Sequence, residues 1–549
     1  MIKATDLFVK CLENEGIKRI FGVPGEENAD LMLSLQHSSI QFVITRHEQG
    51  AAFMAAVHGR LTGTVGVCLG TLGPGATNLM TGVADGNMDR APLLVITGQG
   101  ATTRQHKESH QMMDAVGMFR SVTKWSQAIL TPDAIPEIVR KAVKLAEAEK
   151  PGAVHIELAE DIAAMETDAV PLARIAVRRP SPNGEAVDKA WALIEAAKCP
   201  LIIAGNGTIR TRASAALRSF CETTGIGVLM TFMAKGALDL EDPHCLFTIG
   251  LGQRDFPMSV VDGADLIITM GYDMVEYPPH KWNPSGDKKI VHLDFIPAEV
   301  DGRYIPAVEV VGDLAASITA LKEKAAMGDT EFDLGDQKAL RQKMLEEFEE
   351  HRNQSDTGLI KPQKAIADVR ACLGPSDILL CGVGAHKMWV ARQYQSHEPG
   401  TCIISNGFCS MGMPLPGAIS ASMSCPSRKV LGLAGDGDFL MNVQEMETAS
   451  RLKSDITMLV WEDHSYGLIA WKQEQEFGTH TDLSFSNPDW MQLGQSFGWK
   501  VDVCDQAASL QSTLRSALDH KGPALVVIPV DYSENMKLTK RLGRLTACL

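Results

Sequence analysis

Short apolar segments that end in glycine recur along the whole chain, and each precedes a stretch with helical periodicity. Uninterrupted apolar segments of this length are typical of strands buried on both faces, and their alternation with helices is typical of doubly wound parallel sheets. The pattern recurs in three stretches of a 549-residue chain, which is too long for a single core. We therefore predict an α/β fold with three doubly wound parallel-sheet domains.

Two segments of different composition separate the three stretches. Residues 166–185 combine prolines and charges with little periodicity, which predicts a surface linker. Residues 325–360 are highly charged and include a helical stretch that we expect to be a solvated face. The expected domains are therefore N-terminal (1–165), central and Rossmann-like (186–325) and C-terminal (361–549).

The predicted strands share runs of apolar residues. In chain order they are 20–23, 42–45, 66–69, 93–97, 154–158, 200–204, 265–270, 290–294, 378–381, 429–434, 456–461 and 524–528.

Composition excludes several classes of protein. The net charge is −15 with no long basic run, which argues against nucleic acid as a partner. No apolar run reaches the roughly 18–20 residues of a membrane span, and the N-terminus lacks the features of a signal peptide. The twelve cysteines form no C-x-x-C pair and are expected to be reduced core residues. A cytoplasmic enzyme is the expectation.

Two acidic loops follow strands of the third stretch. Strand 429–434 ends at a Gly-Asp-Gly-Asp loop, after which a helix is expected at 439–452. Strand 456–461 ends at Glu-Asp, which puts Asp463 27 residues after Asp436. Parallel strands end at one sheet edge, so the two aspartates could share a hard cation such as Mg²⁺ and leave coordination places for a diphosphate. The Gly-Asp-Gly tripeptide alone is equally compatible with a turn that caps a helix.

A glutamate stands where strand 42–45 meets a helix rich in small residues. Taken alone, Glu48 is a first-turn residue favoured by the helix dipole. A glycine-rich turn, Gly-Pro-Gly, follows at 73–75 after the next strand. Glycines at such a turn let the backbone approach a ligand closely.

These segments carry a resemblance to a known family. Residues 435–467 resemble the signature of thiamine-diphosphate-dependent enzymes, and RHEQGAAFMA with GTLGPGATN resembles their glutamate and glycine-turn segments. The resemblance covers essentially the whole chain and is closest to the acetolactate synthases, particularly the catabolic, flavin-independent type. Its further segments are HQMMD (110–114), GYDMVEY (271–277), ISNG (404–407) and PVDYS (529–533). The chain departs from the pattern at Leu72, usually Ser, and at Glu462, usually Asn.

The resemblance implies thiamine diphosphate and Mg²⁺ as cofactors. It assigns the metal to Asp436, Asp463 and the carbonyl of Ser465. It also assigns Glu48 to the aminopyrimidine ring, whose imino tautomer then takes the proton from the reactive carbon. Met411 would support the bend of the cofactor, and the carbonyl of Cys409 would hold its amino group. The other implied cofactor contacts are Pro24, Thr71, Gly75, Asn78, Gly384, His386, Gly435, Gly437, Asp438 and Tyr466.

The implied reaction decarboxylates one pyruvate and joins the two-carbon fragment to a second pyruvate, giving 2-acetolactate and CO₂. His110, Gln111 and Gln473 are the expected contacts of the second pyruvate, and His110 and Gln111 join Glu48 and Met411 in the expected catalytic set. FAD is disfavoured, because GYDMVEY replaces the GARFDDR-like flavin segment, and Lys472 stands where the biosynthetic enzymes carry tryptophan. Since the family builds each site from two subunits, a homodimer is implied as the minimum active unit, and a homotetramer is expected.

Several alternatives stay open. One is another thiamine-diphosphate-dependent 2-keto acid decarboxylase or carboligase, and another is a flavin-containing biosynthetic synthase; product analysis with pyruvate separates these. A catalytically silent binding subunit is disfavoured by the intact Glu48, Asp436 and Asp463. A nicotinamide dehydrogenase is disfavoured because the glycine segment 205–210 lacks the last glycine of G-x-G-x-x-G.

Overall fold

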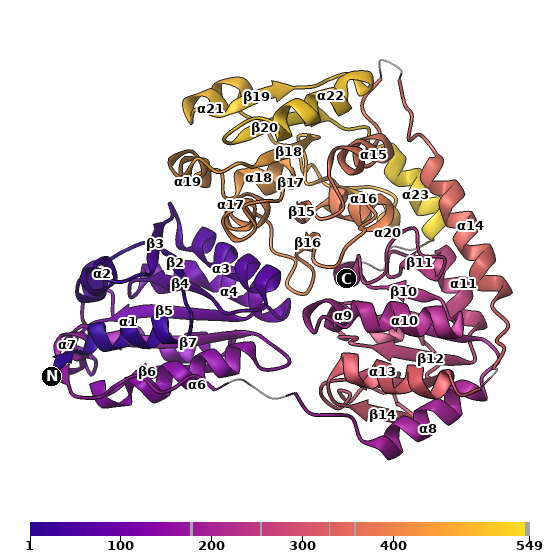
Figure 1. Ribbon diagram of the computed structural model, residues 1–549. Coiled ribbons are helices and arrows are strands. Elements are labelled where there is room, and N and C mark those ends of the chain that lie inside the picture. Colours follow the sequence, from indigo (N-terminus) through magenta and orange to yellow (C-terminus); the bar gives the residue numbers. More distant parts are fainter. Residues whose placement is uncertain (176–178, 253–254, 329, 356–357, 544–549) are drawn as a thin grey trace. The chain divides into compact units, whose positions relative to one another are not determined.

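A computed structural model describes most of the chain. The described residues are 1–175, 179–252, 255–328, 330–355 and 358–543. The description therefore leaves out residues 176–178 of the predicted linker, residues 329 and 356–357 of the predicted connector, and residues 544–549 of the predicted C-terminal domain. Within it the chain forms three six-stranded sheets in which all neighbouring strands run parallel. The predicted α/β fold is confirmed (Figure 1).

The first sheet has the strand order β3-β2-β4-β5-β7-β6. Its strands are β2 (Arg19–Gly22), β3 (Gln41–Ile44), β4 (Gly66–Gly70), β5 (Leu93–Gln99), β6 (Trp125–Ile129) and β7 (Ala153–Ala159). The helices around it are α1 (Ala4–Asn14), α2 (Ala29–Gln36), α3 (Glu48–Thr62), α4 (Pro74–Met88), α5 (Ala115–Phe119), α6 (Ile135–Glu147) and α7 (Glu160–Ala164). The chain passes outward from β2 to β3 and then returns to β4, so the winding reverses between β2 and β4. A ligand site in such a sheet lies beyond the strand ends at this switch point.

The central sheet has the order β11-β10-β9-β12-β13-β14. Its strands are β9 (Pro200–Ala204), β10 (Val228–Met230), β11 (Cys245–Thr248), β12 (Leu266–Met270), β13 (Lys289–Asp294) and β14 (Val308–Val311). The main helices here are α8 (Gly184–Glu195), α9 (Asn206–Arg210), α10 (Ser214–Thr224), α11 (Phe256–Gly263), α13 (Leu314–Ala325) and α14 (Gly335–Glu349). In this sheet the switch point lies between β9 and β12.

The third sheet repeats the strand order of the first, as β16-β15-β17-β18-β20-β19. Its strands are β15 (Ile378–Cys381), β16 (Cys402–Ile404), β17 (Val430–Gly435), β18 (Thr457–Glu462), β19 (Lys500–Val503) and β20 (Ala524–Pro529). Its helices include α15 (Pro362–Cys372), α16 (Ala385–Gln393), α18 (Asp436–Leu440), α20 (Gly467–Phe477), α21 (Trp490–Ser496), α22 (Ala507–Leu518) and α23 (Glu534–Leu542). The switch point lies between β15 and β17.

The chain divides into two compact units that do not follow its order. One contains the first sheet together with residues 407–427 and 440–456, and the other contains the central and third sheets. Helices α17 (Pro414–Ser424) and α19 (Glu445–Leu452) thus belong with the N-terminal sheet. The hydroxyl of Ser420 donates to the carbonyl of Met54 in α3 over 2.6 Å. Sequence distance is therefore a poor guide to neighbours in this unit.

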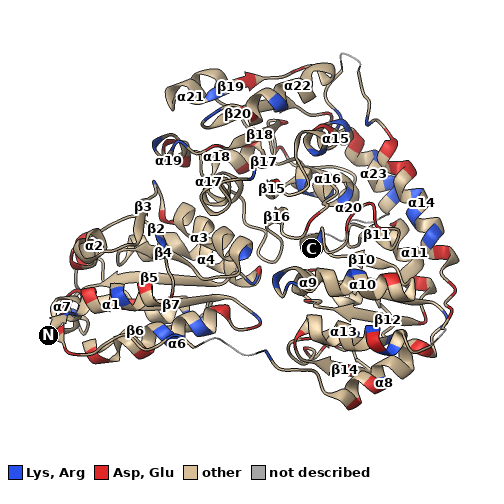
Figure 2. Cartoon of the chain, viewed as in Figure 1, with Lys and Arg blue, Asp and Glu red and all other residues tan. Residues whose placement is uncertain are grey.

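One detail of the predicted secondary structure is wrong, and one helix is more buried than expected. The helix expected at 439–452 is broken into α18 and α19, because the Asn442 side chain turns to the carbonyl of Gly412 (2.9 Å) and competes with helical bonding. The connector helix α14 is not merely a solvated face, although Figure 2 shows charges of both signs on it. Leu340, Met344 and Glu347 are buried, since their spacing puts them on one side of the helix.

In the described part of the chain, no helix combines the length and the apolar character needed to cross a membrane.

Candidate active site

Asp436 and Asp463 lie together beyond the ends of β17 and β18. Asp436 is buried, and its Oδ2 accepts hydrogen bonds from the backbone N–H groups of Asp463 (3.2 Å) and His464 (2.8 Å). Its Oδ1 accepts from the N–H of Gly437 at 2.8 Å. A Cβ on Gly467 would lie 2.4 Å from Oδ2 of Asp463, so this glycine makes room for the Asp463 carboxylate at the start of α20. The structure thus brings both predicted metal-binding side chains to one place.

Burial, and then the negative charge of Asp436, raise the pKa of Asp463 to about 7. Two carboxylates held together away from water are unfavourable unless a cation lies between them. Oxygen donors of this kind suit Mg²⁺ better than a soft metal ion. Among the described residues no group of three or more His, Cys, Asp or Glu side chains could hold a metal.

His386 lies between the two loops of the C-terminal switch point. A Cβ on Gly384 would lie 2.7 Å from the imidazole ring, and one on Gly435 would lie 3.2 Å from Nδ1. His386 Nε2 is 3.6 Å from Oδ2 of Asp438, and both side chains are buried. On Gly437 a Cβ would lie 3.0 Å from the ring of Tyr466. The glycines therefore let the rings of His386 and Tyr466 pack closely against this backbone.

Glu462, which replaces the usual asparagine, is held by residues that the sequence prediction missed. Its Oε1 accepts hydrogen bonds from Asn487 Nδ2 (2.9 Å) and Trp490 Nε1 (2.6 Å). Asn487 also donates to Oδ2 of Asp436 at 2.8 Å. Asn487 thus connects the two acidic loops. No strand pattern marks it in the sequence, and only its polar loop at the start of α21 could have indicated it.

Glu48 is the first residue of α3 in the N-terminal unit. The side chain is 7% exposed, and its Oε2 accepts a hydrogen bond from Asn78 Nδ2 at 2.9 Å. Its Oε1 lies 3.4 Å from the position of a Cβ on Gly75, beside the glycine turn. The helix continues with Gly50, Ala51 and further buried small residues. A buried carboxyl group with a neutral partner is suited to sharing a proton with a ring nitrogen.

The turn between β3 and Glu48 is held by a second glutamate, which the sequence analysis did not single out. Glu445 Oε1 accepts from the backbone N–H groups of Arg46 (3.1 Å) and His47 (3.0 Å). Burial raises the pKa of Glu445. A Cβ on Gly50 would lie 2.7 Å from the same oxygen, so the carboxylate packs directly on the first turn of α3. Glu445 therefore fixes the backbone on both sides of Glu48.

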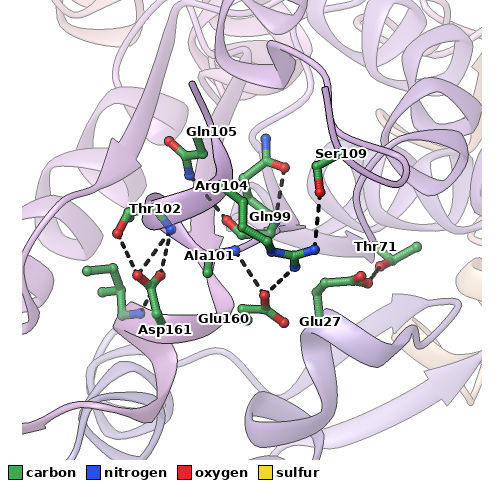
Figure 3. A network of polar contacts seen from close by, with 12 residues as sticks. Glu27, Thr71, Gln99, Ala101, Thr102, Arg104, Gln105, Ser109, Glu160 and Asp161 are labelled. Carbon is green, nitrogen blue, oxygen red and sulfur yellow. Dashed lines mark hydrogen bonds and ion pairs between the residues drawn. The ribbon is translucent and has the colours of Figure 1, made fainter. Parts of the chain in front are cut away.

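Pro24 and Thr71 lie at the switch point of the N-terminal sheet. Thr71 follows β4, and its hydroxyl donates to Glu27 Oε2 at 2.9 Å (Figure 3). A Cβ on Gly25, the neighbour of Pro24, would lie 2.4 Å from the Thr71 side chain. The turns after β2 and β4 are thus in direct contact.

Cys409 and Met411 belong to a segment of the N-terminal unit that is anchored on α4. The N–H of Gly407 donates to Asp89 Oδ1 at 2.7 Å, and that of Ser410 donates to Asp85 Oδ1 at 3.2 Å. Cys409 has a φ of 55°, a left-handed conformation that is unfavourable for cysteine. Two buried aspartates therefore hold a strained turn, as is common at functional sites.

The three expected contacts of the second pyruvate are distributed over both units. His110 and Gln111 lie on an exposed loop of the N-terminal unit, where Gln111 has a φ of 56°. A Cβ on Gly73 would lie 2.7 Å from the Gln111 carbonyl oxygen, so this loop touches the glycine turn. Gln473, in the other unit, accepts from the N–H of Thr481 at 2.9 Å and thereby holds the segment after α20.

The switch point of the central sheet is filled by the chain itself. The loops after β9 and β12 are in contact, with a Cβ position on Gly207 only 2.5 Å from the Cα of Gly271. Glu276 accepts from the N–H of Asn206 (2.9 Å) and from the hydroxyl of Thr231. Burial raises the pKa of Glu276 to about 7.

Comparison with known families gives one consistent result. Residues 2–118, 187–321 and 382–528 match the N-terminal, central and C-terminal domains of thiamine pyrophosphate enzymes. An acetolactate synthase of Bacillus subtilis (strain 168) is 34% identical, over 99% of this chain and 96% of its own length. The catabolic acetolactate synthase of Raoultella terrigena is also 34% identical, over 98% and 96%. The acetolactate synthase isozyme 1 large subunit of Escherichia coli (strain K12) is 30% identical, over 97% and 94%.

The coverage of these relatives is nearly complete, and each of the three sheets overlaps one matched domain. The chain belongs to the thiamine-diphosphate-dependent acetolactate synthase family.

Proposed function

We propose that this chain is an acetolactate synthase that converts two molecules of pyruvate into 2-acetolactate and CO₂, with thiamine diphosphate and Mg²⁺ as cofactors. The observation that carries the proposal is the acid pair beyond the ends of β17 and β18, in which the buried Asp436 raises the pKa of the half-buried Asp463. Bound thiamine diphosphate supplies the electron sink that decarboxylation of a 2-keto acid requires.

In this proposal the C-terminal domain holds the charged end of the cofactor. Asp436, Asp463 and the Ser465 carbonyl hold Mg²⁺, while the backbone from Gly435 to Asp438 and the segment from Gly384 to His386 lie along the diphosphate. Burial and the negative charge of Asp436 raise the pKa of Asp463, and a bound Mg²⁺ would relieve the repulsion between the two acids.

In the proposal the N-terminal unit binds the pyrimidine end of the cofactor. Glu48 holds a proton at the pyrimidine ring and is kept in place by Asn78 and, through the backbone, by Glu445. Met411 and the Cys409 carbonyl support the ring from the segment anchored on Asp85 and Asp89. His110 and Gln111, together with Gln473, orient the second pyruvate.

The proposed enzyme works without flavin. The central switch point, where a dinucleotide would be expected in a sheet of this strand order, is occupied by Glu276 and by the contact of Gly207 with Gly271. Every cysteine in the described part of the chain is a free thiol, in keeping with a site of action in the reducing cytoplasm.

The test is incubation of the purified full chain with pyruvate, thiamine diphosphate and Mg²⁺ without FAD. We expect acetoin after acid treatment of the product, and no increase on adding FAD. Release of acetaldehyde without acetolactate would instead identify a simple decarboxylase, and no CO₂ release would identify a silent homologue. Glu48→Gln should bind the cofactor and lose CO₂ release by a factor of about 10²–10⁴.

The proposed active unit is a homodimer, within the expected homotetramer, in which Glu48 of one copy serves the cofactor held by Asp436 of the other. Glu48→Gln and Asp436→Asn should each be inactive alone. When the two variants are mixed and allowed to exchange subunits, mixed dimers contain one site with both native acids, so activity should return. If mixing restores nothing although mixed dimers form, each site lies within one chain.

A further inference from the structure

The loop that carries His110 and Gln111 is held by acidic side chains at the carboxyl end of the neighbouring strand (Figure 3). It connects β5 to α5 and lies beside β7, because β5 and β7 are paired from Leu93–Ala153 to Gln99–Ala159. Glu157, Glu160 and Asp161 follow one another at that end of β7 and the start of α7. Each of the three receives hydrogen bonds from residues at or just after the end of β5.

The base of the loop is closed by contacts of Gln99 and Gly100. The Gln99 side chain donates both to Glu157 Oε2 and to the carbonyl of Met113, at 2.9 Å each. A Cβ on Gly100 would lie 2.6 Å from the sulfur of Met112, so the returning arm of the loop packs on the departing one. These contacts fix where the loop begins and ends, but they do not reach its middle.

Arg104 extends the support to the middle of the loop. Its guanidinium forms an ion pair with Glu160 and donates through Nη1 to Ser109 Oγ at 3.2 Å. The same Glu160 oxygen accepts the N–H of Ala101 at 3.0 Å. One arginine and one glutamate therefore connect the start of the loop to Ser109, the residue directly before His110 (Figure 3).

The backbone around Gln111 explains why such support matters. Gln111 has a φ of 56°, which is unfavourable for a residue with a side chain, and its carbonyl oxygen is pressed against Gly73 of the glycine turn. A strained residue on an exposed loop keeps its conformation only where the surroundings determine it. The Arg104–Glu160 pair is itself partly exposed, at 37% and 39%, so it contributes little to overall stability.

We propose that Arg104 and Glu160 are positioning residues that set the acceptor specificity of the enzyme. By holding Ser109 they fix His110 and Gln111 over the glycine turn, where the second pyruvate must be oriented to capture the two-carbon fragment. The inference rests on the proposed function. When the loop is loosened, the fragment takes up a proton in place of the second pyruvate, and acetaldehyde is released where acetolactate would have formed.

The test compares wild type with Arg104→Met and Glu160→Gln in the full chain with thiamine diphosphate and Mg²⁺. We measure CO₂, acetolactate and acetaldehyde against pyruvate concentration. A misplacement of about 1 Å can cost about a hundredfold in rate, so we expect the ratio of acetolactate to acetaldehyde to fall at least tenfold in Arg104→Met. CO₂ release should change by less than about threefold, because the decarboxylating residues are elsewhere. Arg104→Lys should give a ratio between those of Arg104→Met and wild type, since lysine lacks the planar guanidinium group that reaches both Glu160 and Ser109.

Two control variants separate this proposal from a general loosening of the loop. Asp161→Asn weakens the acceptor for the N–H of Thr102 (3.0 Å) but leaves Ser109 held, so the product ratio should stay at the wild-type value. Glu185→Gln removes a partner of the exposed ion pair with Lys189 in α8 and should change nothing. An unchanged ratio in Arg104→Met, or an equal fall in Asp161→Asn, overturns the proposal. A wild-type enzyme that makes no acetolactate overturns the proposed function instead.

Discussion

The central and C-terminal sheets both place a half-buried acid beyond the ends of their strands, yet the surroundings of the two acids differ. Glu276 of the central sheet receives the N–H of Asn206 and the hydroxyl of Thr231. Asp463 of the C-terminal sheet faces a second acid, Asp436. The pKa of each is raised to about 7, in both cases first by burial.

Glu276 and Asp463 differ in the groups that surround the carboxylate. In the central sheet the chain itself donates hydrogen bonds to Glu276, and Gly207 packs against Gly271. Glu276 is therefore held entirely by contacts within the protein. In the C-terminal sheet the chain also donates hydrogen bonds to Asp436, yet the negative charge of this acid still raises the pKa of Asp463. The negative charge of Asp273 likewise raises the pKa of Glu276, so the clearest difference is the close packing of Gly207 against Gly271 beside Glu276.

The largest effect should come from breaking the acid pair. Asp436→Asn removes a hard oxygen ligand and the acceptor of two loop N–H groups. We expect activity to fall on the order of a thousandfold, about 4 kcal/mol in the activation free energy. Asp463→Asn should also raise the thermal midpoint of the cofactor-free protein, because it relieves repulsion, and abolish the increase that Mg²⁺ and thiamine diphosphate produce. Calorimetry with and without both cofactors tests this, and a rise on cofactor addition equal to that of wild type would contradict it.

Replacing Glu276 should change the free energy of unfolding by an amount that depends on pH. Glu276 has a pKa of about 7 in the folded protein and an ordinary value of 4.5. The stability that its neutral form contributes to the folded protein is therefore fully present below about pH 4.5 and is lost as the pH rises through 7. Glu276→Gln has no proton to lose. Relative to wild type, its free energy of unfolding should therefore increase by up to about 3 kcal/mol between pH 5 and pH 8.

Denaturant unfolding at the two pH values measures this difference. The exposed Glu222, changed to Gln, is the control and should show no such trend. A constant difference between wild type and Glu276→Gln across the range would mean that Glu276 is already ionised without cost.

A smaller effect is expected at the bridge between the acidic loops. Asn487→Ala removes the donor to Asp436 and Glu462 without touching either acid. Partners that orient metal ligands typically contribute 10–100-fold in affinity, so the Mg²⁺ concentration for half-maximal activity should rise about tenfold, or about 1.4 kcal/mol. The exposed amide of Gln492, replaced by Ala, is the matched control, and a similar rise there would exclude a specific role for Asn487.

The smallest effect should follow Glu462→Asn, which introduces the residue usual in the family. An asparagine oxygen can still accept from Trp490 and Asn487, which now hold Glu462. We expect the Mg²⁺ requirement to change by less than about threefold. A larger loss would show that the chain has adapted its loop to the longer acid.

The sheets could be predicted wherever strands are long and buried, as in β5 and β7, which are buried throughout. Six strands of the three large sheets were not predicted, and five of them form sheet edges, namely β6, β11, β14, β16 and β19. Edge strands such as β19 (KVDV) and β14 (VEVV) contain charged residues, so their apolar pattern is interrupted.

The acid pair could be anticipated because the ends of adjacent parallel strands must meet at one edge. Asn487 could not, since no periodicity connects a loop residue to a strand end 25 positions earlier. Glu445 could not be predicted either, because its partner Arg46 lies 399 positions earlier in the chain, in the N-terminal domain. Contacts between side chains and distant backbone depend on the packing of domains, which strand patterns do not encode.

The placement of α17 and α19 in the N-terminal unit has a consequence for biosynthesis. At elongation rates of about 5–20 residues per second, α3 leaves the ribosome roughly 20–70 seconds before the helix whose Ser420 it must receive. During that interval its face of small apolar residues has no native cover. The nascent N-terminal third should therefore be a client of chaperones until the last quarter of the polypeptide has been translated.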